Sequence, residues 1–447
     1  MGKHVWHSRQ KKHYSLLLAL CCFCFISCSG TSVSPAPRSS PTQGTAPAFT
    51  FEACSATVSQ LSRSRGCLTP DDLRQAYGVS PLLARGLDGK GETVIDIVSY
   101  GSPELQQDLD VFDQTFHLPS LTVPQLSPLG TVPYNAQNTD MVNWAGETTE
   151  DVEVIHAIAP GAKIIVLTDP VDETEGMAGL PQILQLEQYA VAHHLGQIIC
   201  QSFATAEVNF PDAQSQHFLQ QYSDFVQSAT TSAGWTIFAA SGDTGAAGYN
   251  NIQSTTFAST PSVYFPADLP WVTAVGGTTL QHDAAGQFTE ITWPGSGGGF
   301  SKFFPEPAYQ QSLSKTLQTQ LHGARGLPDV SADADHTTGL VDYIGGQWRP
   351  AGGTSAAQPT WSAIMAIADQ MAGHPLGFIN QALYKVGTSS RASVDFHDIT
   401  VGNNTHTAEV LVPGYAAVSG WDPATGFGSP FANQLLPDLI AAINTSA

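Results

Sequence analysis

The sequence contains few charged residues, and basic residues are the scarcer kind. Charged residues make up 12% of the 447 positions, and 17 lysines and arginines stand against 38 aspartates and glutamates, for a formal net charge of −21. Globular proteins usually carry about twice this share of charge. Such an acidic surface repels phosphate backbones and anionic lipid, which excludes a nucleic-acid-binding protein. Many carboxylates discharge together near the pI of about 4.8, which indicates an acidic working environment.

Long hydrophobic runs are also missing. Residues 15–27 form one apolar stretch after a basic, His-rich segment; it is too short to span a bilayer and is typical of a secretory signal peptide. We therefore expect residues 1–27 to be a signal peptide, with an uncleaved membrane anchor as the alternative. Residues 25–28 resemble a lipoprotein cleavage box, so we expect either a secreted protein or one attached to the cell surface through a lipid on Cys28. Residues 28–66 have the Ser/Pro/Thr-rich composition of a tether and N-terminal extension.

Cysteine is scarce too, since four of the seven cysteines belong to the leader. Cys54 and Cys67 could close one short disulfide loop in an exported protein. Cys200 lies in an apolar run without a cysteine–histidine motif around it, which predicts a buried thiol and not a nucleophile.

From Cys67 onward, strand-like apolar runs alternate with helix-like segments. This order predicts an α/β fold with a parallel sheet and helices on both faces, in which sites lie beyond the carboxyl ends of the strands. We expect one domain over residues 67–447. The expected strands are 91–101, 162–169, 197–203 and 235–243, and the expected helices are 103–116, 147–158, 180–196 and 217–234.

A serine lies in a glycine-rich turn just before a helix-like segment. Residues 352–359 read GGTSAAQP, and Ser355 is the serine. A hydroxyl at such a turn is exposed, and backbone N–H groups there can face a developing oxyanion; a purely structural turn is the alternative. The pattern is similar to that of subtilisin-like serine peptidases, which use a histidine base in an HGT motif. None of the 14 histidines lies in such a motif, so a different base is needed.

Carboxylates offer that base. Glu147 and Asp151 are four residues apart, so on a helix they share one face. Two carboxyls this close hold one proton between them, and a Glu, with a reference pKa of about 4.3, suits general-base work only in acid. The alternative is a solvated acidic helix turn, a role that Glu150 and Glu153, on other faces of the helix, fit better.

A further acid follows a buried strand. Asp243 lies in SGDTGA, where a turn-capping role is the alternative to a catalytic one. If it faces Ser355, its protonated form could donate a hydrogen bond to an oxyanion.

Taken in chain order, these segments resemble the sedolisin family of serine-carboxyl peptidases. The resemblance extends over nearly everything from Cys67 to the C-terminus. Further matching segments are 265–267 (FPA), 275–278 (VGGT), 297–301 (GGGFS) and 325–330 (RGLPDV).

The resemblance implies a subtilisin-like α/β fold with a central parallel sheet and a single catalytic domain. In that family the matching positions make Ser355 the nucleophile, Glu147 the base, Asp151 its orienting partner and Asp243 the oxyanion donor. The function implied is a secreted or surface-anchored, acid-acting peptidase that hydrolyses polypeptides, as a monomer without nucleic-acid partners. The alternatives are a catalytically weak or inactive, calcium-stabilised surface protein of the same fold, and a neutral subtilisin-type peptidase.

The C-terminal part resembles the sedolisin calcium site in DFHDITVGNN and SGWDPATGFGSP. The implied ligands of one structural Ca²⁺ are the carboxylates of Asp398 and Asp422 and the carbonyls of Ile399, Val418 and Gly420, a set of hard oxygens that suits this ion. Two turn aspartates without an ion are the alternative.

Two features depart from the family pattern. Sedolisins usually carry a long folded prosegment, whereas only about 40 residues separate Cys28 from the catalytic domain. We therefore expect a prosegment-less, bacterial-type member, unless a prosegment acts in trans. The stretch that often reads SxSWG is replaced by QSFAT at 201–205, which alters one wall of the cleft.

Overall fold

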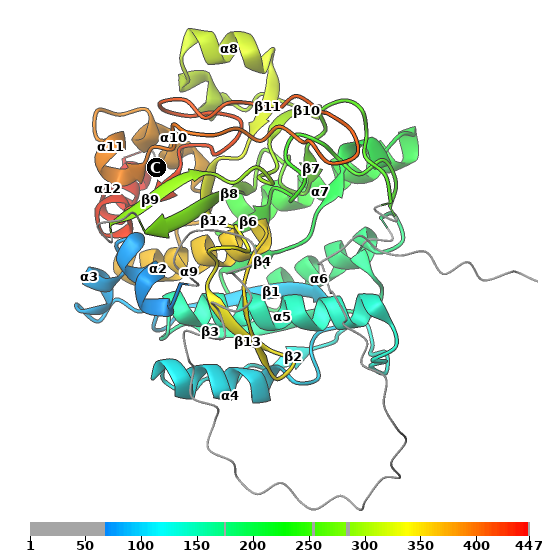
Figure 1. Ribbon diagram of the computed structural model, residues 1–447, viewed down its shortest axis with the longest axis vertical. Coiled ribbons are helices and arrows are strands. Elements are labelled where there is room, and N and C mark those ends of the chain that lie inside the picture. Colours follow the sequence, from blue (N-terminus) through cyan, green and yellow to red (C-terminus); the bar gives the residue numbers. More distant parts are fainter. Residues whose placement is uncertain (1–67, 174–175, 253–254, 283–286, 446–447) are drawn as a thin grey trace, which may run out of the picture.

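The computed structural model describes residues 68–173, 176–252, 255–282 and 287–445 (Figure 1). The predicted signal peptide, the lipid attachment at Cys28 and the disulfide between Cys54 and Cys67 lie outside these residues. None of the helices in the described ranges has the length and apolar character that crossing a bilayer requires.

The centre of the fold is an eight-stranded sheet in the order β12-β8-β6-β4-β1-β3-β2, with β9 paired to β8. The pairs along this path are parallel, and only β9 runs antiparallel to its neighbour. Its strands are β1 (Thr93–Ser99), β2 (Gln125–Leu126), β3 (Lys163–Asp169), β4 (Ile198–Gln201), β6 (Thr236–Ala240), β8 (Thr273–His282), β9 (Phe288–Thr292) and β12 (Val330–Asp333).

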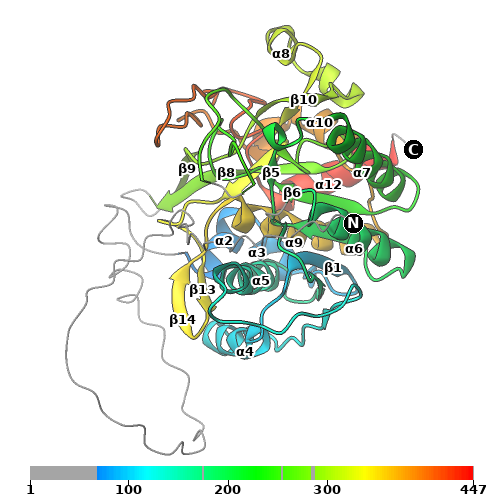
Figure 2. The same ribbon diagram turned by 90° about the vertical axis from the view of Figure 1, so that its right-hand side faces the viewer.

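Helices cover both faces of this sheet. Helices α5 and α9 pack against each other and against the strands, whereas α6 and α7 lie on the other side (Figure 2). Strands β1, β4, β6 and β12 are buried along their whole length, as a parallel sheet covered on two faces requires. The helices are α2 (Pro70–Ala76), α3 (Ser80–Leu83), α4 (Leu105–Phe116), α5 (Thr139–Ile158), α6 (Leu180–Ala192), α7 (Ala213–Thr231), α8 (Lys315–Leu321), α9 (Thr354–Ala372), α10 (Asn380–Gly387), α11 (Ala392–Asp395) and α12 (Ala432–Asn444).

Short antiparallel pairs complete the fold. The hairpin of β13 (Val341–Ile344) and β14 (Gln347–Pro350) packs on α4 and α5 and leads directly into the turn before α9. The other pairs are β5 (Thr205–Ala206) with β7 (Tyr264–Phe265), β10 (Gly299–Pro305) with β11 (Ala324–Leu327), and β15 (Phe396–His397) with β16 (Ser429–Pro430).

The predicted fold class is confirmed: an α/β fold with a central parallel sheet flanked by helices. The main difference concerns α5, which begins at Thr139 and not at Glu147. The side chain of Asn138 caps it by accepting hydrogen bonds from the backbone amides of Asp140 and Met141 at 2.9 and 3.3 Å. An Asn at this position satisfies amides that have no partner inside the helix, so α5 gains two turns before its catalytic face.

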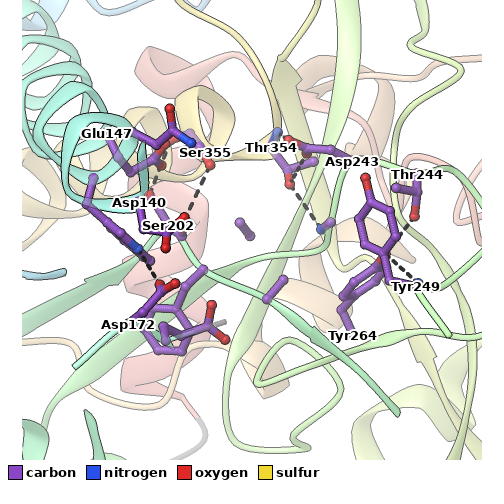
Figure 3. A pocket seen from close by; sticks show the side chains of 17 residues that line it. Asp140, Glu147, Asp172, Ser202, Asp243, Thr244, Tyr249, Tyr264, Thr354 and Ser355 are labelled. Carbon is purple, nitrogen blue, oxygen red and sulfur yellow. Dashed lines mark hydrogen bonds between the residues drawn. The ribbon is translucent and has the colours of Figure 1, made fainter. Parts of the chain in front are cut away.

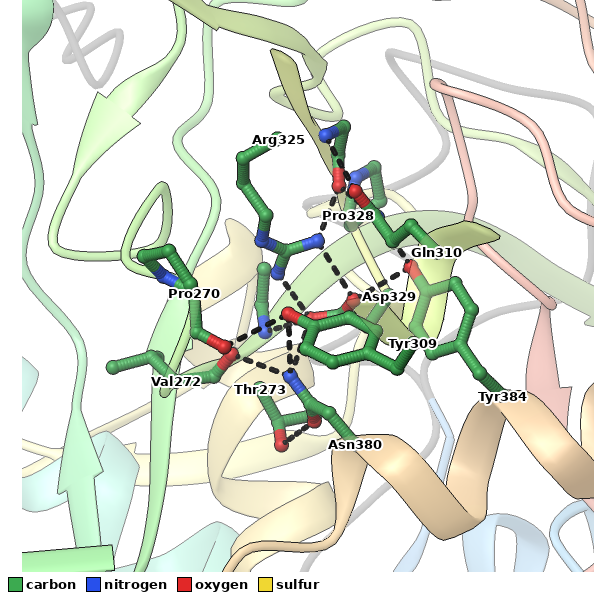
Figure 4. Close-up of polar contacts among 12 residues, drawn as sticks. Pro270, Val272, Thr273, Tyr309, Gln310, Arg325, Pro328, Asp329, Asn380 and Tyr384 are labelled. Carbon is green, nitrogen blue, oxygen red and sulfur yellow. Dashed lines mark hydrogen bonds and ion pairs between the residues drawn. The ribbon is translucent and has the colours of Figure 1, made fainter. Parts of the chain in front are cut away.

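A buried ion pair fastens the segment between β11 and β12 to the rest of the sheet (Figure 4). The Arg325 Nη1 donates to Asp329 Oδ1 at 2.9 Å, and both side chains are fully buried. The same carboxylate accepts hydrogen bonds from the Ala274 amide and the Tyr384 hydroxyl, each at 2.8 Å. The charge of Asp329 is thus met by several donors, which buried ion pairs need if they are not to destabilise a fold. Asp329 thereby joins β8 and α10 to the start of β12.

Candidate active site

The turn before α9 presents Ser355 at the start of that helix. Gly353 adopts φ +79°, and a Cβ there would lie 2.4 Å from Asp243 Oδ2. A side chain at position 353 would therefore clash with Asp243 and strain the backbone. Glycine at this position lets the helix start approach Asp243 closely, and Ser355 stays partly exposed.

Asp243 follows β6 and is tied to the first residue of α9. Its Oδ1 accepts hydrogen bonds from the Thr354 amide at 2.7 Å and from the Thr354 hydroxyl group at 2.8 Å. The Gly242 amide in turn donates to the Thr354 hydroxyl at 3.0 Å. Asp243 is therefore hydrogen-bonded to the N-terminus of α9, and its Oδ2 lies near the start of the helix that carries Ser355.

Glu147 and Asp151 lie one turn apart on α5, and Figure 3 shows Glu147 beside Ser355. Burial raises the pKa of Glu147 well above its usual range, and the charge of Glu150 raises it further, while the neighbouring Ser355 hydroxyl works in the opposite direction. Burial, followed by the charges of Asp96 and Glu147, likewise raises the pKa of Asp151. Glu147 is therefore held in an environment where it can keep or accept a proton.

Ser202 connects the nucleophile to the acid pair. Its hydroxyl donates to Asp151 Oδ1 at 2.8 Å, and the Ser355 hydroxyl lies 3.5 Å from its carbonyl oxygen. Ser202 belongs to the stretch 201–205, and its neighbours Phe203 and Ala204 line the same cleft. The stretch that departs from the family pattern thus forms a cleft wall, as its position in the sequence predicts.

One candidate residue of the site was missed by sequence reasoning. Asp96 of β1 is fully buried, and its carboxyl, that of Asp151 and the thiol of Cys200 lie within 4.8 Å of one another. Burial raises the pKa of Asp96 to about 7, with Asp151 lowering it in part. An Asp in the middle of the otherwise apolar run TVIDIVS could have been noticed, because a charge in a buried strand requires a partner.

Cys200 itself behaves as the sequence predicts. It is buried, its Sγ donates to Gln358 Oε1 at 2.9 Å, and burial raises the pKa of its thiol well above the usual value. A thiol in this environment is not a nucleophile.

The expectation for Glu150 and Glu153 was wrong. Both were expected in solvent, but they are 9% and 0% exposed. The outer face of α5 is covered by α4 and by the β13–β14 hairpin, an arrangement between distant segments that local spacing does not reveal. Burial raises the pKa of Glu150 to about 7.

The charged groups that line the cleft in front of Ser355 are acidic. Its volume is about 340 Å³, and among the described residues it is lined by neither a histidine nor a basic side chain. Burial raises the pKa of three of the lining acids, Asp140, Glu147 and Glu173. The carboxyls of the lining come from Asp140, Glu147, Asp172, Glu173 and Asp243.

The predicted calcium ligands lie together near the C-terminal end. The Asp398 carboxylate accepts from the Gly420 amide at 2.9 Å and Asp422 Oδ2 accepts from the Val418 amide at 3.0 Å, so both acids converge on one loop. Within the described residues, no hydrogen bond reaches the carbonyls of Ile399, Val418 or Gly420. Two carboxylates and three carbonyls with open oxygens fit the preferences of Ca²⁺.

Comparison with known proteins shows which family shares this fold. The model of the Subtilase family (Peptidase_S8) matches residues 130–378. Kumamolisin of Bacillus sp. (strain MN-32) is 32% identical over 381 residues, covering 83% of this chain and 63% of that protein. Sedolisin of Pseudomonas sp. (strain 101) is 32% identical over 350 residues, covering 75% and 56%.

A solved structure agrees with the sequence relatives. Pseudomonas sedolisin, a serine-carboxyl proteinase complexed with two molecules of pseudo-iodotyrostatin, is 28% identical and has a TM-score of 0.68. That match covers 86% of this chain and 99% of the solved chain. The protein therefore belongs to the subtilase family and, within it, to the sedolisin family of serine-carboxyl peptidases. The chain spans about three fifths of the length of the curated relatives that it matches.

Proposed function

We propose that the protein is an acid-acting serine-carboxyl peptidase that hydrolyses peptide bonds in polypeptides. The observation that carries this proposal is the convergence of three separate elements on one cleft: α5 supplies Glu147, the loop after β6 supplies Asp243, and α9 supplies Ser355. This set provides a nucleophile, a base and an oxyanion donor without a histidine.

In the first half of the reaction, the Ser355 Oγ attacks the carbonyl carbon of the scissile bond and its proton passes to Glu147. The carbonyl oxygen becomes an oxyanion, which Asp243 stabilises by donating a hydrogen bond from its protonated carboxyl. Thr354 occupies Oδ1 of Asp243, so Oδ2 carries that proton. Glu147 then gives its proton to the leaving amine, and an acyl-serine remains.

In the second half, water attacks the acyl-serine and Glu147 takes a proton from it. The oxyanion forms again at Asp243, and its collapse releases the carboxylic acid while Glu147 returns the proton to Ser355. Asp151 and Asp96 act through Glu147, because their buried carboxyls interact electrostatically with it. Such a cluster titrates as a unit. When the cluster as a whole has lost one proton, Glu147 can accept a proton from Ser355 even in acid.

The decisive experiment is proteolysis of a denatured protein between pH 2 and 8, with cleavage sites read by mass spectrometry. We expect cleavage in acid that disappears towards neutral pH, because the oxyanion donor must be protonated. Comparable cleavage at pH 8 and pH 4 would overturn the mechanism. Binding of a polypeptide at pH 4 without any cleavage would instead identify an inactive member of the family.

We further propose that one Ca²⁺ binds the 398–422 region. The carboxylates of Asp398 and Asp422 and the carbonyls of Ile399, Val418 and Gly420 would hold it, and the ion would fasten this loop without taking part in the reaction. The convergence of both acids on the loop supports this.

We also propose that the protein works outside the cytoplasm as a monomer. The apolar stretch at 15–27 and the acidic composition support export, followed either by secretion or by attachment to the cell surface through Cys28. Labelling of cells with a radioactive fatty acid, compared with a Cys28→Ser variant, distinguishes the two outcomes.

A further inference from the structure

The β13–β14 hairpin packs on α4 and α5 (Figure 2), and carboxyl groups of these helices accept hydrogen bonds from its backbone. Glu153 Oε2 accepts from the Tyr343 amide at 2.8 Å, and Asp108 Oδ2 accepts from the Gly345 amide at 2.8 Å. Glu150 Oε1 accepts from the Gly352 amide at 3.2 Å. The last bond joins the hairpin support to the turn that carries the nucleophile, because Gly352 lies three residues before Ser355.

A further buried acid comes from the hairpin itself. Asp342 of β13 is fully buried, and neither of its carboxyl oxygens has a hydrogen-bond partner among the described residues. It interacts electrostatically with both Glu150 and Glu153. Three carboxyls thus meet at one dry interface, where two or three negative charges would repel each other strongly.

Little positive charge is available to offset such repulsion. Arg349, opposite Asp342 in the hairpin, has an exposed side chain whose charge lowers the pKa of both Glu150 and Asp342, and His156 of α5 lies 3.1 Å from Asp113 of α4. Among the described residues, the other charged groups that act on this cluster are acidic. They are Asp108 and Asp113 on α4, Glu147 and Asp151 on α5, and Asp243 after β6.

We propose that the Glu150–Glu153–Asp342 cluster is a pH-dependent support of the active site. When the cluster is protonated in acid, it holds the hairpin in place and positions the Gly352–Ser355 turn. When it ionises towards neutral pH, it releases the hairpin. Glu150 is then a positioning residue for the nucleophile. The consequence for activity rests on the proposed peptidase function, whereas the release of the hairpin does not.

The size of the effect follows from proton linkage. Burial raises the pKa of Glu150 from 4.5 to about 7. If release of the hairpin exposes this carboxyl, raising the pH from 4.5 to 7.5 favours the released state by roughly 10²-fold for this group alone. Asp342 and Glu153, whose pKa values are also raised by burial, add to this shift.

Hydrogen exchange on the full-length protein tests the proposal without any substrate. Between pH 4.5 and 7.5, after correction for the intrinsic exchange rate, we expect segment 341–352 to lose protection by 10-fold or more through local opening, while β1, which exchanges only when the whole domain unfolds, stays unexchanged over the same labelling time. Asp342→Asn should preserve protection of the hairpin at pH 7.5, and Glu150→Gln should do the same, because its amide oxygen can still accept from Gly352. Asp110→Asn, the same charge change at an exposed position of α4, serves as the matched control and should behave as wild type.

Three results would overturn the proposal. They are an unchanged hairpin protection in the wild type, a loss of protection shared equally by β1, and a loss that persists in both Asp342→Asn and Glu150→Gln. If the protein cleaves polypeptides, the ratio of kcat at pH 6.5 to kcat at pH 4.5 should also rise in Asp342→Asn with little change in KM. Absence of cleavage by the wild type at every pH would refute the peptidase function and leave the exchange result standing.

Discussion

The buried carboxyl of Asp369, which lies outside the active site, should make the protein less stable as the pH rises. Asp369 lies in the last turn of α9, where its Oδ1 accepts from the Leu376 amide at 2.9 Å and its Oδ2 is buried without a partner among the described residues. Burial raises its pKa from 3.8 to about 8, with the charge of Glu92 adding to this and the Leu376 amide opposing it. A negative charge at the C-terminus of a helix is unfavourable in any case.

The direction follows from proton binding. Between pH 4 and 8 the folded protein retains a proton on Asp369 that the unfolded chain has lost, so the free energy of unfolding falls as the pH rises through this window. One pKa unit corresponds to about 1.4 kcal/mol, so the full change is at most roughly 5 kcal/mol. Asp369→Asn keeps an oxygen that can accept the hydrogen bond from the Leu376 amide, and it removes the carboxyl that titrates.

We expect Asp369→Asn to have nearly wild-type stability at pH 4 and to be more stable than wild type by several kcal/mol at pH 8. The measurement is urea unfolding followed by tryptophan fluorescence from pH 4 to 8, in a Ser355→Ala background that prevents self-digestion. Asp224→Asn, at an exposed position of α7, is the control. A stability difference between Asp369→Asn and wild type that does not change with pH would refute the reasoning.

Three further predictions concern the site. Ser355→Ala should abolish turnover while the circular dichroism spectrum stays native, and turnover near the wild-type level would mean that another residue is the nucleophile. Asp243→Ala should lower kcat by roughly 10²–10³-fold, whereas Asp243→Asn should lose less, because an amide can still donate to the oxyanion; equal losses would contradict the donor role. Calcium should raise the melting temperature through binding to the native state, and Asp422→Ala should abolish that response; a chelator titration at pH 5 that leaves melting of calcium-loaded protein unchanged would count against the site.

The alternation of apolar runs and helix-like segments was enough to predict the sheet. Strands β1, β3, β4 and β6 fall inside their predicted ranges, because burial on both faces leaves a nearly continuous apolar pattern in sequence. The glycine-rich turn before Ser355 could also be predicted from the sequence. The close approach of this turn to Asp243 leaves no room for a side chain at position 353, so a glycine is found there.

Long-range burial was not visible in the sequence. Periodicity on α5 separates one face from another, but it cannot show that a hairpin two hundred residues away covers the polar face. Glu150 and Glu153 therefore looked like solvent-facing acids, although both are buried under β13 and β14. Asp96 was missed for a related reason: its partner Asp151 lies on a helix that packs on β1, and spacing along the chain does not record that contact.

The order in which the active site is built along the chain has a consequence for the cell that makes the protein. Glu147 and Asp151 leave the ribosome first, Asp243 follows, and the nucleophile comes last, on a helix that must dock beside α5 onto strands already synthesised. Folding during translation proceeds from the N-terminal side, so a nascent chain that ends before residue 355 holds every carboxyl of the site and no serine to activate. On the proposed mechanism, synthesis cannot yield a prematurely active fragment, and proteolysis begins only when α9 has docked.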